Sequence, residues 1–228
     1  MNQDPPASAP LDAVIESTLG HLWAAANDLG RLRPAREGEY RVTIFGSARV
    51  TAADPVYAEV RDLARRLAAL GCTIVTGGGP GLMQAANEGE RLGDPDDRRQ
   101  TIGIRVELPF EQGPNPFVEQ DHSHRTFFTR LHHFARLSDA FVVVEGGIGT
   151  TLESLMIWQL LQVKHLPEVP LIFVGPMWRG LVDWAKHAML RPGRPLASAR
   201  DLELPVCVAT ATDAVAVIER DLARRRPG

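Results

Sequence analysis

Residues 142–153 read Val-Val-Val-Glu-Gly-Gly-Ile-Gly-Thr-Thr-Leu-Glu. The β-branched run that ends at Val144 predicts a buried strand, and the apolar positions after Gly149 predict a helix. The three glycines between them predict a tight turn. At the start of such a helix, backbone N–H groups without neighbouring side chains form a site for phosphate or another anion. The stretch therefore predicts a strand–turn–helix unit with an anion site at its turn.

A second turn of the same kind follows another short apolar run and reads T-G-G-G-P-G from Thr76 to Gly81. Around the two turns, short apolar segments alternate with helical patterns from Tyr40 onward. This alternation predicts an α/β fold, a doubly wound parallel sheet with helices on both faces, in three layers α/β/α. In such sheets, ligands bind outside the carboxyl ends of the strands. Both glycine turns are expected at those ends.

The elements follow from the apolar periodicity and the positions of glycine and proline. Expected strands cover 41–45, 72–75, 101–108, 117–120, 140–144, 169–174 and 206–209. Expected helices cover 55–70, 81–92, 124–137, 149–162, 177–190 and 211–225, with 191–204 as loop. An amphipathic helix is expected at 11–32, before the first strand. We therefore expect an N-terminal tail and helix in 1–38, and a single nucleotide-binding domain in 39–228.

The composition of the 228 residues is that of a soluble globular protein, with 44% hydrophobic and 23% charged residues. The net charge of −3 gives no reason to expect a nucleic-acid partner. Residues 1–10 do not resemble a signal peptide, and no run reaches the roughly 20 apolar residues of a membrane helix. Cys72 and Cys207 lie far apart in apolar runs and are expected to be reduced thiols. We expect a cytoplasmic protein without a membrane partner.

Neither turn fits the common nucleotide motifs. The dinucleotide pattern G-x-G-x-x-G fails at both, and no G-x-x-x-x-G-K-[ST] occurs. The remaining expectation is a site for a phosphate or a ribose phosphate without a dedicated lysine clamp.

Three stretches together resemble a known family. Residues 77–87 read G-G-G-P-G-L-M-Q-A-A-N, residues 107–112 read E-L-P-F-E-Q with Asn115-Pro116 shortly after, and residues 146–153 read G-G-I-G-T-T-L-E. They resemble the motifs of the LOG family, cytokinin riboside 5′-monophosphate phosphoribohydrolases formerly called possible lysine decarboxylases. The resemblance implies a Rossmann-like homodimer or larger oligomer. It also implies hydrolysis of the N-glycosidic bond of an AMP-like nucleotide, which gives free base and ribose 5-phosphate without metal or organic cofactor.

The chain departs from the family pattern at two positions. Glu145 stands where the family has a proline, and Leu131 stands where it has a lysine. An added carboxylate and a lost cation both weaken phosphate binding, because such near-surface charge effects reach roughly a few kcal/mol. The alternative is therefore a non-catalytic sensor of the same fold that binds a nucleotide or phosphate ligand.

By the resemblance, Arg130 and Glu153 form the catalytic pair. Glu153 lies four residues after Gly149, so its side chain reaches back toward the turn. A carboxylate there stabilises the positive charge that develops on the ribose, or activates the attacking water. The alternatives are a glutamate that complements the helix dipole and an arginine in a structural ion pair.

The other site residues are assigned to the two turns and their surroundings. Phosphate and ribose contacts are expected at Gly78, Gly79, Gly146, Gly147, Gly149 and Thr150. Further nucleotide contacts are expected at Ser47, Arg49, Met83, Asn87 and Glu145. The alternatives are glycines that only make tight turns and a Met83 that packs in the core.

Other chemistries find less support in the sequence. His122, His124, His132 and His133 have no nearby cysteine or carboxylate pair that completes a metal-ligand set, so no metal is expected. Lysine decarboxylation by a pyridoxal phosphate Schiff base needs a positioned lysine, and the two lysines, Lys164 and Lys186, lie outside the glycine turns. The helix at 151–162 is apolar nearly all round, which predicts burial and a homodimer through this helix.

Overall fold

The computed structural model describes residues 15, 19, 39–96, 98–107 and 113–225. Contacts divide the chain into two compact units, Met1–Glu37 and Gly38–Gly228. In the first unit only Ile15 and Leu19 are described, and both are helical. The rest of the predicted helix at 11–32 lies outside the described residues, and the division into 1–38 and 39–228 stays a prediction.

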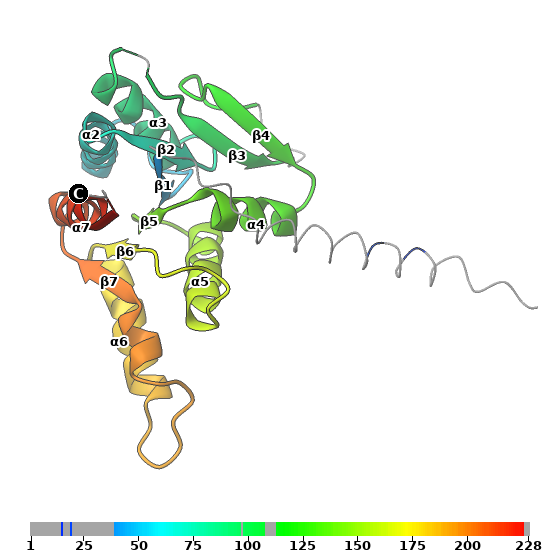
Figure 1. Ribbon diagram of the computed structural model, residues 1–228, viewed down its shortest axis with the longest axis vertical. Coiled ribbons are helices and arrows are strands. Elements are labelled where there is room, and N and C mark those ends of the chain that lie inside the picture. Colours follow the sequence, from blue (N-terminus) through cyan, green and yellow to red (C-terminus); the bar gives the residue numbers. More distant parts are fainter. Residues whose placement is uncertain (1–14, 16–18, 20–38, 97, 108–112, 226–228) are drawn as a thin grey trace, which may run out of the picture. The chain divides into compact units, whose positions relative to one another are not determined.

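Within the described residues, seven parallel strands form one sheet in the order β4-β3-β2-β1-β5-β6-β7 (Figure 1). The strands are β1 (Tyr40–Phe45), β2 (Cys72–Thr76), β3 (Ile102–Val106), β4 (Gln120–His124), β5 (Ala140–Val143), β6 (Leu171–Val174) and β7 (Pro205–Val208). The chain runs outward from β1 to β4 and then returns to place β5 on the other side of β1. The carboxyl ends of β1 and β5 therefore flank the point where the winding direction reverses.

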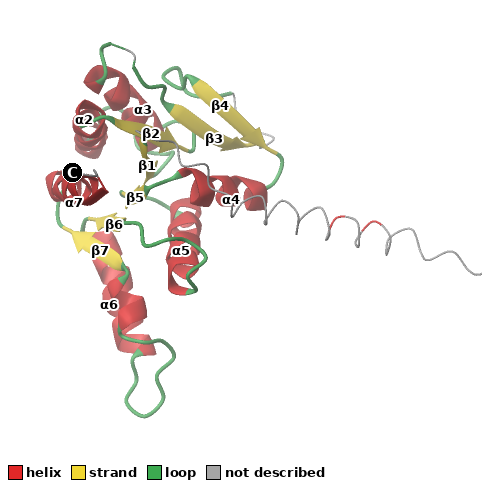
Figure 2. Cartoon of the chain, in the orientation of Figure 1, coloured by secondary structure: helices red, strands yellow, loops and turns green. Residues whose placement is uncertain are grey.

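Helices cover both faces of this sheet (Figure 2). They are α2 (Pro55–Ala69), α3 (Leu82–Gly93), α4 (Phe127–Leu137), α5 (Ile148–Gln162), α6 (Pro176–Met189) and α7 (Ala211–Arg225). One core lies between the sheet and α2, α3 and α7, and a second core lies between the sheet and α4, α5 and α6. This arrangement confirms the predicted three-layer, doubly wound α/β fold.

Both cores depend on strands that are apolar on each face. In β1, Val42 and Ile44 belong to the first core, whereas Phe45 belongs to the second and packs edge-on against Phe134 of α4. A parallel sheet covered on both sides has no solvent-facing row, so its inner strands read as continuous apolar runs. That is why these strands were recognisable in the sequence.

The polar edge strand was predicted in the wrong place. The sequence indicated a short strand at 117–120, but β4 spans Gln120–His124 and pairs with β3. The strand is at the edge of the sheet and mostly exposed, so it lacks an apolar signature. Helix α4 starts at Phe127 rather than at residue 124, because the Thr126 side chain accepts from the Thr129 N–H and caps the helix. A short 3₁₀ helix, Arg200–Glu203, lies in the segment predicted as loop.

Helix α5 is not buried all round as its composition suggested. Glu153 and Ile157 face the sheet, whereas Ile148, Leu152 and Leu155 are exposed, Ile148 to 88%. Among the described residues, no helix combines the length and the apolar character that a membrane span requires.

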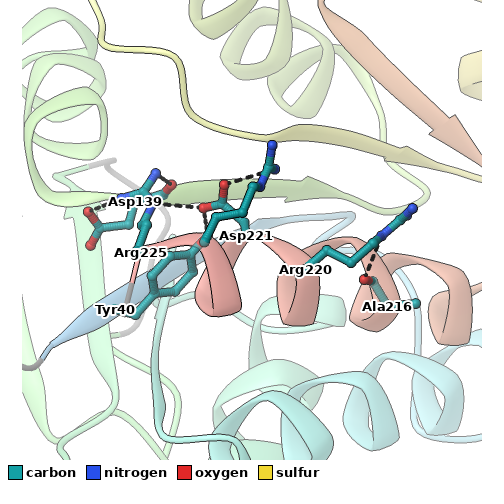
Figure 3. Close-up of polar contacts among 7 residues, drawn as sticks. Tyr40, Asp139, Ala216, Arg220, Asp221 and Arg225 are labelled. Atoms are coloured by element: carbon teal, nitrogen blue, oxygen red, sulfur yellow. Dashed lines mark hydrogen bonds and ion pairs between the residues drawn. The ribbon is translucent and has the colours of Figure 1, made fainter. Parts of the chain in front are cut away.

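A polar cluster ties the last helix to the first strand (Figure 3). The Tyr40 hydroxyl donates to Asp221 Oδ2 at 2.6 Å, and Arg225 Nε lies 2.8 Å from the same oxygen. The Arg225 guanidinium lies over the Tyr40 ring and also reaches Asp139. Burial and the bond to Asp221 raise the pKa of Tyr40. Because β1 begins at Tyr40, this cluster lies at the end of the sheet opposite the glycine turns.

We expect Tyr40→Phe to lower the free energy of unfolding by about 1.5–3 kcal/mol, because it removes a buried hydrogen bond to a carboxylate. Tyr57→Phe is the matched control, since Tyr57 donates to Glu88 at 2.9 Å in a less buried setting. Urea denaturation at pH 7 measures both variants. Equal losses in the two would contradict a special contribution from the Tyr40 cluster.

Candidate functional site

The carboxyl ends of β1 and β5 border a cavity of about 320 Å³. It is lined by Ser47, Val50, Glu145, Gly146, Gly147 and Met177. Open α/β sheets bind ligands where the strand order reverses, which is where this cavity lies. Its volume is at the lower end of the range for small-molecule sites.

The turn after β5 is open to solvent. Gly147 and Gly149 are exposed, and a Cβ atom added at either would meet no heavy atom within 4 Å. Gly147 precedes the first residue of α5, so the first N–H groups of that helix lie at this open turn. The turn is also held firmly, because Trp178 Nε1 donates to Val144 O at 3.0 Å and Ser47 N donates to Glu145 O at 2.9 Å.

The turn after β2 is covered instead. Gly77, Gly78 and Gly79 are buried, and the side chains of Met83 and Arg105 lie over them. The Gly78 N–H donates to Thr76 Oγ1 at 2.9 Å, so the protein itself uses this donor. The ligand contacts expected at Gly78 and Gly79 stay predictions. The two turns, which look alike in the sequence, thus differ in their access to solvent.

Arg130 of α4 and Glu153 of α5 meet beneath this edge of the sheet. Arg130 Nη1 lies 2.7 Å from Glu153 Oε1, and each side chain is only 11% exposed. Arg130 Nε also donates to Ile104 O of β3 at 2.8 Å, and its guanidinium lies 5.2 Å from the centre of the Phe134 ring. The guanidinium packs so closely against Gly77 that a Cβ atom at Gly77 would collide with it. Gly77 therefore leaves room for Arg130.

The protonation of Glu153 reflects two opposing effects. Burial raises the pKa of Glu153, while the charge and hydrogen bond of Arg130 work against that rise. The pair thus places a buried carboxylate of raised basicity in the second turn of the helix that begins at the open turn, although neither member of the pair is among the residues that line the cavity. Such a group can activate a water molecule or stabilise a nearby positive charge.

The remaining predicted contacts fall into different surroundings. Ser47 and Glu145 line the cavity, and Arg49 is exposed with its backbone N–H bonded to Ser47 Oγ at 3.1 Å. Met83 lies against the covered turn. Asn87 is fully buried beneath that turn, where its side chain bonds other protein groups.

Leu131 is buried in the core, so the position of the family's lysine does not face the cavity from this helix. Sequence reasoning missed Met177, which lines the cavity from α6, Trp178, which bonds Val144 O just before the open turn, and Arg105, which covers Gly78. No spacing pattern marks these three residues. Asn115 belongs to the middle motif of the family resemblance. That membership was the sequence feature that could have pointed to its place beside the covered turn.

Of the four histidines between residues 122 and 133, three form a cluster, with His122 and His124 on β4 and His133 on α4. The His133 ring packs edge-on against His122 and His124, and its Nδ1 lies 3.0 Å from His124 Nε2. Burial and the neighbouring histidines lower the pKa of His133 to about 4. In the described part of the chain, no group of three or more His, Cys, Asp or Glu side chains is arranged to hold a metal ion. Lys164 follows the far end of α5, and Lys186 lies in the last turn of α6.

Comparison with known proteins gives a family and a fold. The family model described as possible lysine decarboxylase matches residues 83–218. The chain is 27% identical over 146 residues to the pyrimidine/purine nucleotide 5′-monophosphate nucleosidase of Escherichia coli K12, which covers 61% of this chain and 32% of that protein. The chain thus spans about a third of the length of the curated relatives it matches.

Two solved structures illustrate the fold. The molybdenum cofactor carrier protein of Chlamydomonas reinhardtii matches with a TM-score of 0.59 and 20% identity, covering 81% of this chain and 99% of that one. The molybdenum cofactor binding protein of Rippkaea orientalis matches with a TM-score of 0.59 and 16% identity, covering 81% and 98%. At these identities the likeness concerns the fold alone.

We expect Arg130→Met to cost about 3–5 kcal/mol of unfolding free energy at pH 7, because it leaves the Glu153 carboxylate buried without its partner. The double variant Arg130→Met/Glu153→Gln removes that stranded charge and should be more stable than Arg130→Met. The loss in Arg130→Met should also shrink as the pH falls from 7 to 5. Burial raises the pKa of Glu153 and Arg130 opposes that rise, so the pKa in Arg130→Met is higher than in the wild type. As the pH falls, the folded variant therefore takes up a proton before the unfolded chain or the wild type does. Urea denaturation at both pH values tests this, and strictly additive single-variant losses would contradict it.

Proposed function

Because the chain belongs to the possible lysine decarboxylase family, the LOG family that its motifs resemble, we propose that it is an N-glycosyl hydrolase of nucleoside 5′-monophosphates. The observation that carries the proposal is the buried ion pair between Arg130 of α4 and Glu153 of α5, the helix that begins at the open glycine turn. The E. coli relative that is named a nucleotide 5′-monophosphate nucleosidase supports the same reaction class.

We place the 5′-phosphate at the open turn. Gly147 and Gly149 offer a backbone that a phosphate can approach closely, and the first N–H groups of α5 point at it. Gly146 lines the cavity beside them, with the Thr150 side chain packed against it. Thr150 adds its hydroxyl. The covered turn contributes to catalysis by supporting the Arg130 side chain. In this pose Gly78 and Gly79 are the residues of that turn nearest to the ribose.

Glu153 then faces the ribose of a nucleotide bound in this way. As the C1′–N bond breaks, positive charge develops on the ribose, and the Glu153 carboxylate stabilises it. Glu153 also takes a proton from the attacking water, whose oxygen bonds to C1′, while the departing base gains a proton. The products are free base and ribose 5-phosphate. Arg130 holds the carboxylate in place and favours its ionised form against the effect of burial on its pKa.

The base and ribose hydroxyls face the cavity in this pose. Ser47 and Glu145 line that cavity, and Arg49 is exposed with its backbone N–H bonded to Ser47. Met83 lies against the covered turn and Asn87 is buried beneath it. The AMP-like and cytokinin-type substrates implied by the resemblance are the first to test. The proposal uses no metal or organic cofactor, and it does not include lysine decarboxylation, because Lys164 and Lys186 lie far from the turn.

Glu145 favours one alternative, a sensor that binds a nucleotide or phosphate ligand without hydrolysis. Its carboxylate lies beside the open turn and lines the cavity, where it opposes a bound dianion. Leu131 gives this alternative no further support, because its side chain is buried in the core.

The deciding experiment measures free base released from AMP and from isopentenyladenosine 5′-monophosphate by chromatography. We expect release by the wild type and a loss of kcat of at least roughly 100-fold in Glu153→Gln, which removes the general base. Glu88→Gln is the control, since it neutralises a glutamate paired with Arg61 away from the site.

Thermal-shift measurements with AMP distinguish the two functions, because a bound ligand raises the melting temperature by mass action. Stabilisation by AMP without base release from either substrate would favour the sensor. Base release that survives Glu153→Gln would contradict the role given to that residue.

We also propose that the protein is a homodimer through α5, whose exposed Ile148, Leu152 and Leu155 form an apolar strip. Light scattering at micromolar concentration should give twice the chain mass, and Leu155→Arg should give the monomer. Trp184→Arg makes the same change at an exposed apolar residue of α6 and should leave the dimer intact. A monomeric wild type would end this proposal.

A further inference from the structure

A chain of buried polar groups lies beneath the covered turn. Thr76 Oγ1 accepts from the Gly78 N–H and donates to Asn87 Oδ1 at 2.7 Å. The Asn87 amide in turn donates to Thr101 Oγ1 at the start of β3. Asn87 and both threonines are buried. Polar groups removed from water are costly unless they are bonded, so this chain fixes the conformation of the turn from below.

Asn115 fixes the same turn from the other side. Its backbone N–H donates to Gly78 O at 2.8 Å. Its side-chain amide donates to Gly79 O at 3.0 Å, and lies 3.2 Å from Gly78 O and 3.0 Å from Asn87 Oδ1. Its own Oδ1 accepts from Phe117 N at 3.1 Å. Asn115 is 7% exposed, so a residue from the segment after β3 bonds two successive carbonyls of the turn.

This turn is the surface against which Arg130 packs. The guanidinium occupies the space beside Gly77 that a Cβ atom would fill, and the same guanidinium bonds Glu153. A shift of the turn therefore moves the face on which Arg130 rests. In enzymes, misplacement of reacting groups by about 1 Å can cost a hundredfold in rate.

We propose that Asn115 is a positioning residue for the Arg130–Glu153 pair, acting through the carbonyls of Gly78 and Gly79. The kinetic part of this inference rests on the hydrolase function proposed above. Asn115 touches neither member of the pair in the contacts described. Asn115 fixes the conformation of the turn, the turn fixes the position of the Arg130 guanidinium, and Arg130 fixes the position of the Glu153 carboxylate.

The test compares Asn115→Ala with Tyr40→Phe, which removes a buried hydrogen bond at the opposite end of the sheet. Both variants are assayed well below their melting temperatures, on whichever of the two nucleotides the wild type hydrolyses. We expect Asn115→Ala to lose roughly 10- to 100-fold in kcat. Any rise in KM should be a smaller factor, because the phosphate-binding turn after β5 is untouched and only the ribose contacts near Gly78 and Gly79 can shift. Tyr40→Phe should keep its kcat.

An unchanged kcat in Asn115→Ala, with only a lowered melting temperature as in Tyr40→Phe, would overturn the proposal, since the network would then support the fold alone. If Asn115→Ala does not fold, Asn115→Ser is assayed against the same criteria, because serine is too short to bond both carbonyls.

A second readout is independent of activity. In protein labelled with ¹³C-glutamate, the Glu153 carboxyl signal is assigned by its loss in Glu153→Gln and followed through a pH titration. Burial raises the pKa of Glu153 and Arg130 lowers it. If Arg130 is held less firmly, its lowering effect weakens, so the titration midpoint of Glu153 in Asn115→Ala should rise by about 0.5 pH unit or more. Should the wild type release no base, the hydrolase proposal has failed, and this titration alone decides: a midpoint equal to that of Tyr40→Phe would overturn the role of Asn115.

Discussion

The parallel pairing of β1 with both β2 and β5 is the constraint on which the rest of the structure depends. With β1 at the centre, the chain must wind outward in one direction and then return to the other side. The segments after β1, β2 and β5 consequently meet at one edge of the sheet. Helices must cover both faces. Two helices of the second core, α4 and α5, carry Arg130 and Glu153 toward that edge.

The two glycine turns show how one local pattern serves two purposes. After β5, missing side chains leave an approach from solvent to the start of α5. After β2, missing side chains leave room for other parts of the protein, above all for the Arg130 guanidinium beside Gly77. The absence of a Cβ atom thus leaves open space at Gly147 and Gly149 in one turn and admits a protein side chain beside Gly77 in the other.

The fold was predictable because the buried parallel strands are apolar on both faces, and because glycine directly follows β1, β2 and β6. The errors fell where that physics is absent: β4 is a polar edge strand, and Thr126 rather than a hydrophobic pattern starts α4. For the site, the resemblance named Arg130 and Glu153, and the structure brings them within 2.7 Å. The covering of Gly78 by Arg105 and the bonds of Asn115 depend on segments far apart in the sequence, and no periodicity encodes such contacts.

The hydrogen bond between Tyr40 and Asp221 has a consequence for folding during synthesis on the ribosome. The two residues are 181 positions apart, and translation adds roughly 5–20 residues per second. The central strand therefore emerges roughly ten to forty seconds before the helix that secures its first residue. Until β5 is synthesised, one edge of β1 lacks its partner strand. An unpaired strand edge can pair with another chain, so the nascent protein is exposed to association during this interval. Helix α7 is thus both the last of the described elements to be synthesised and the one that bonds the start of the central strand.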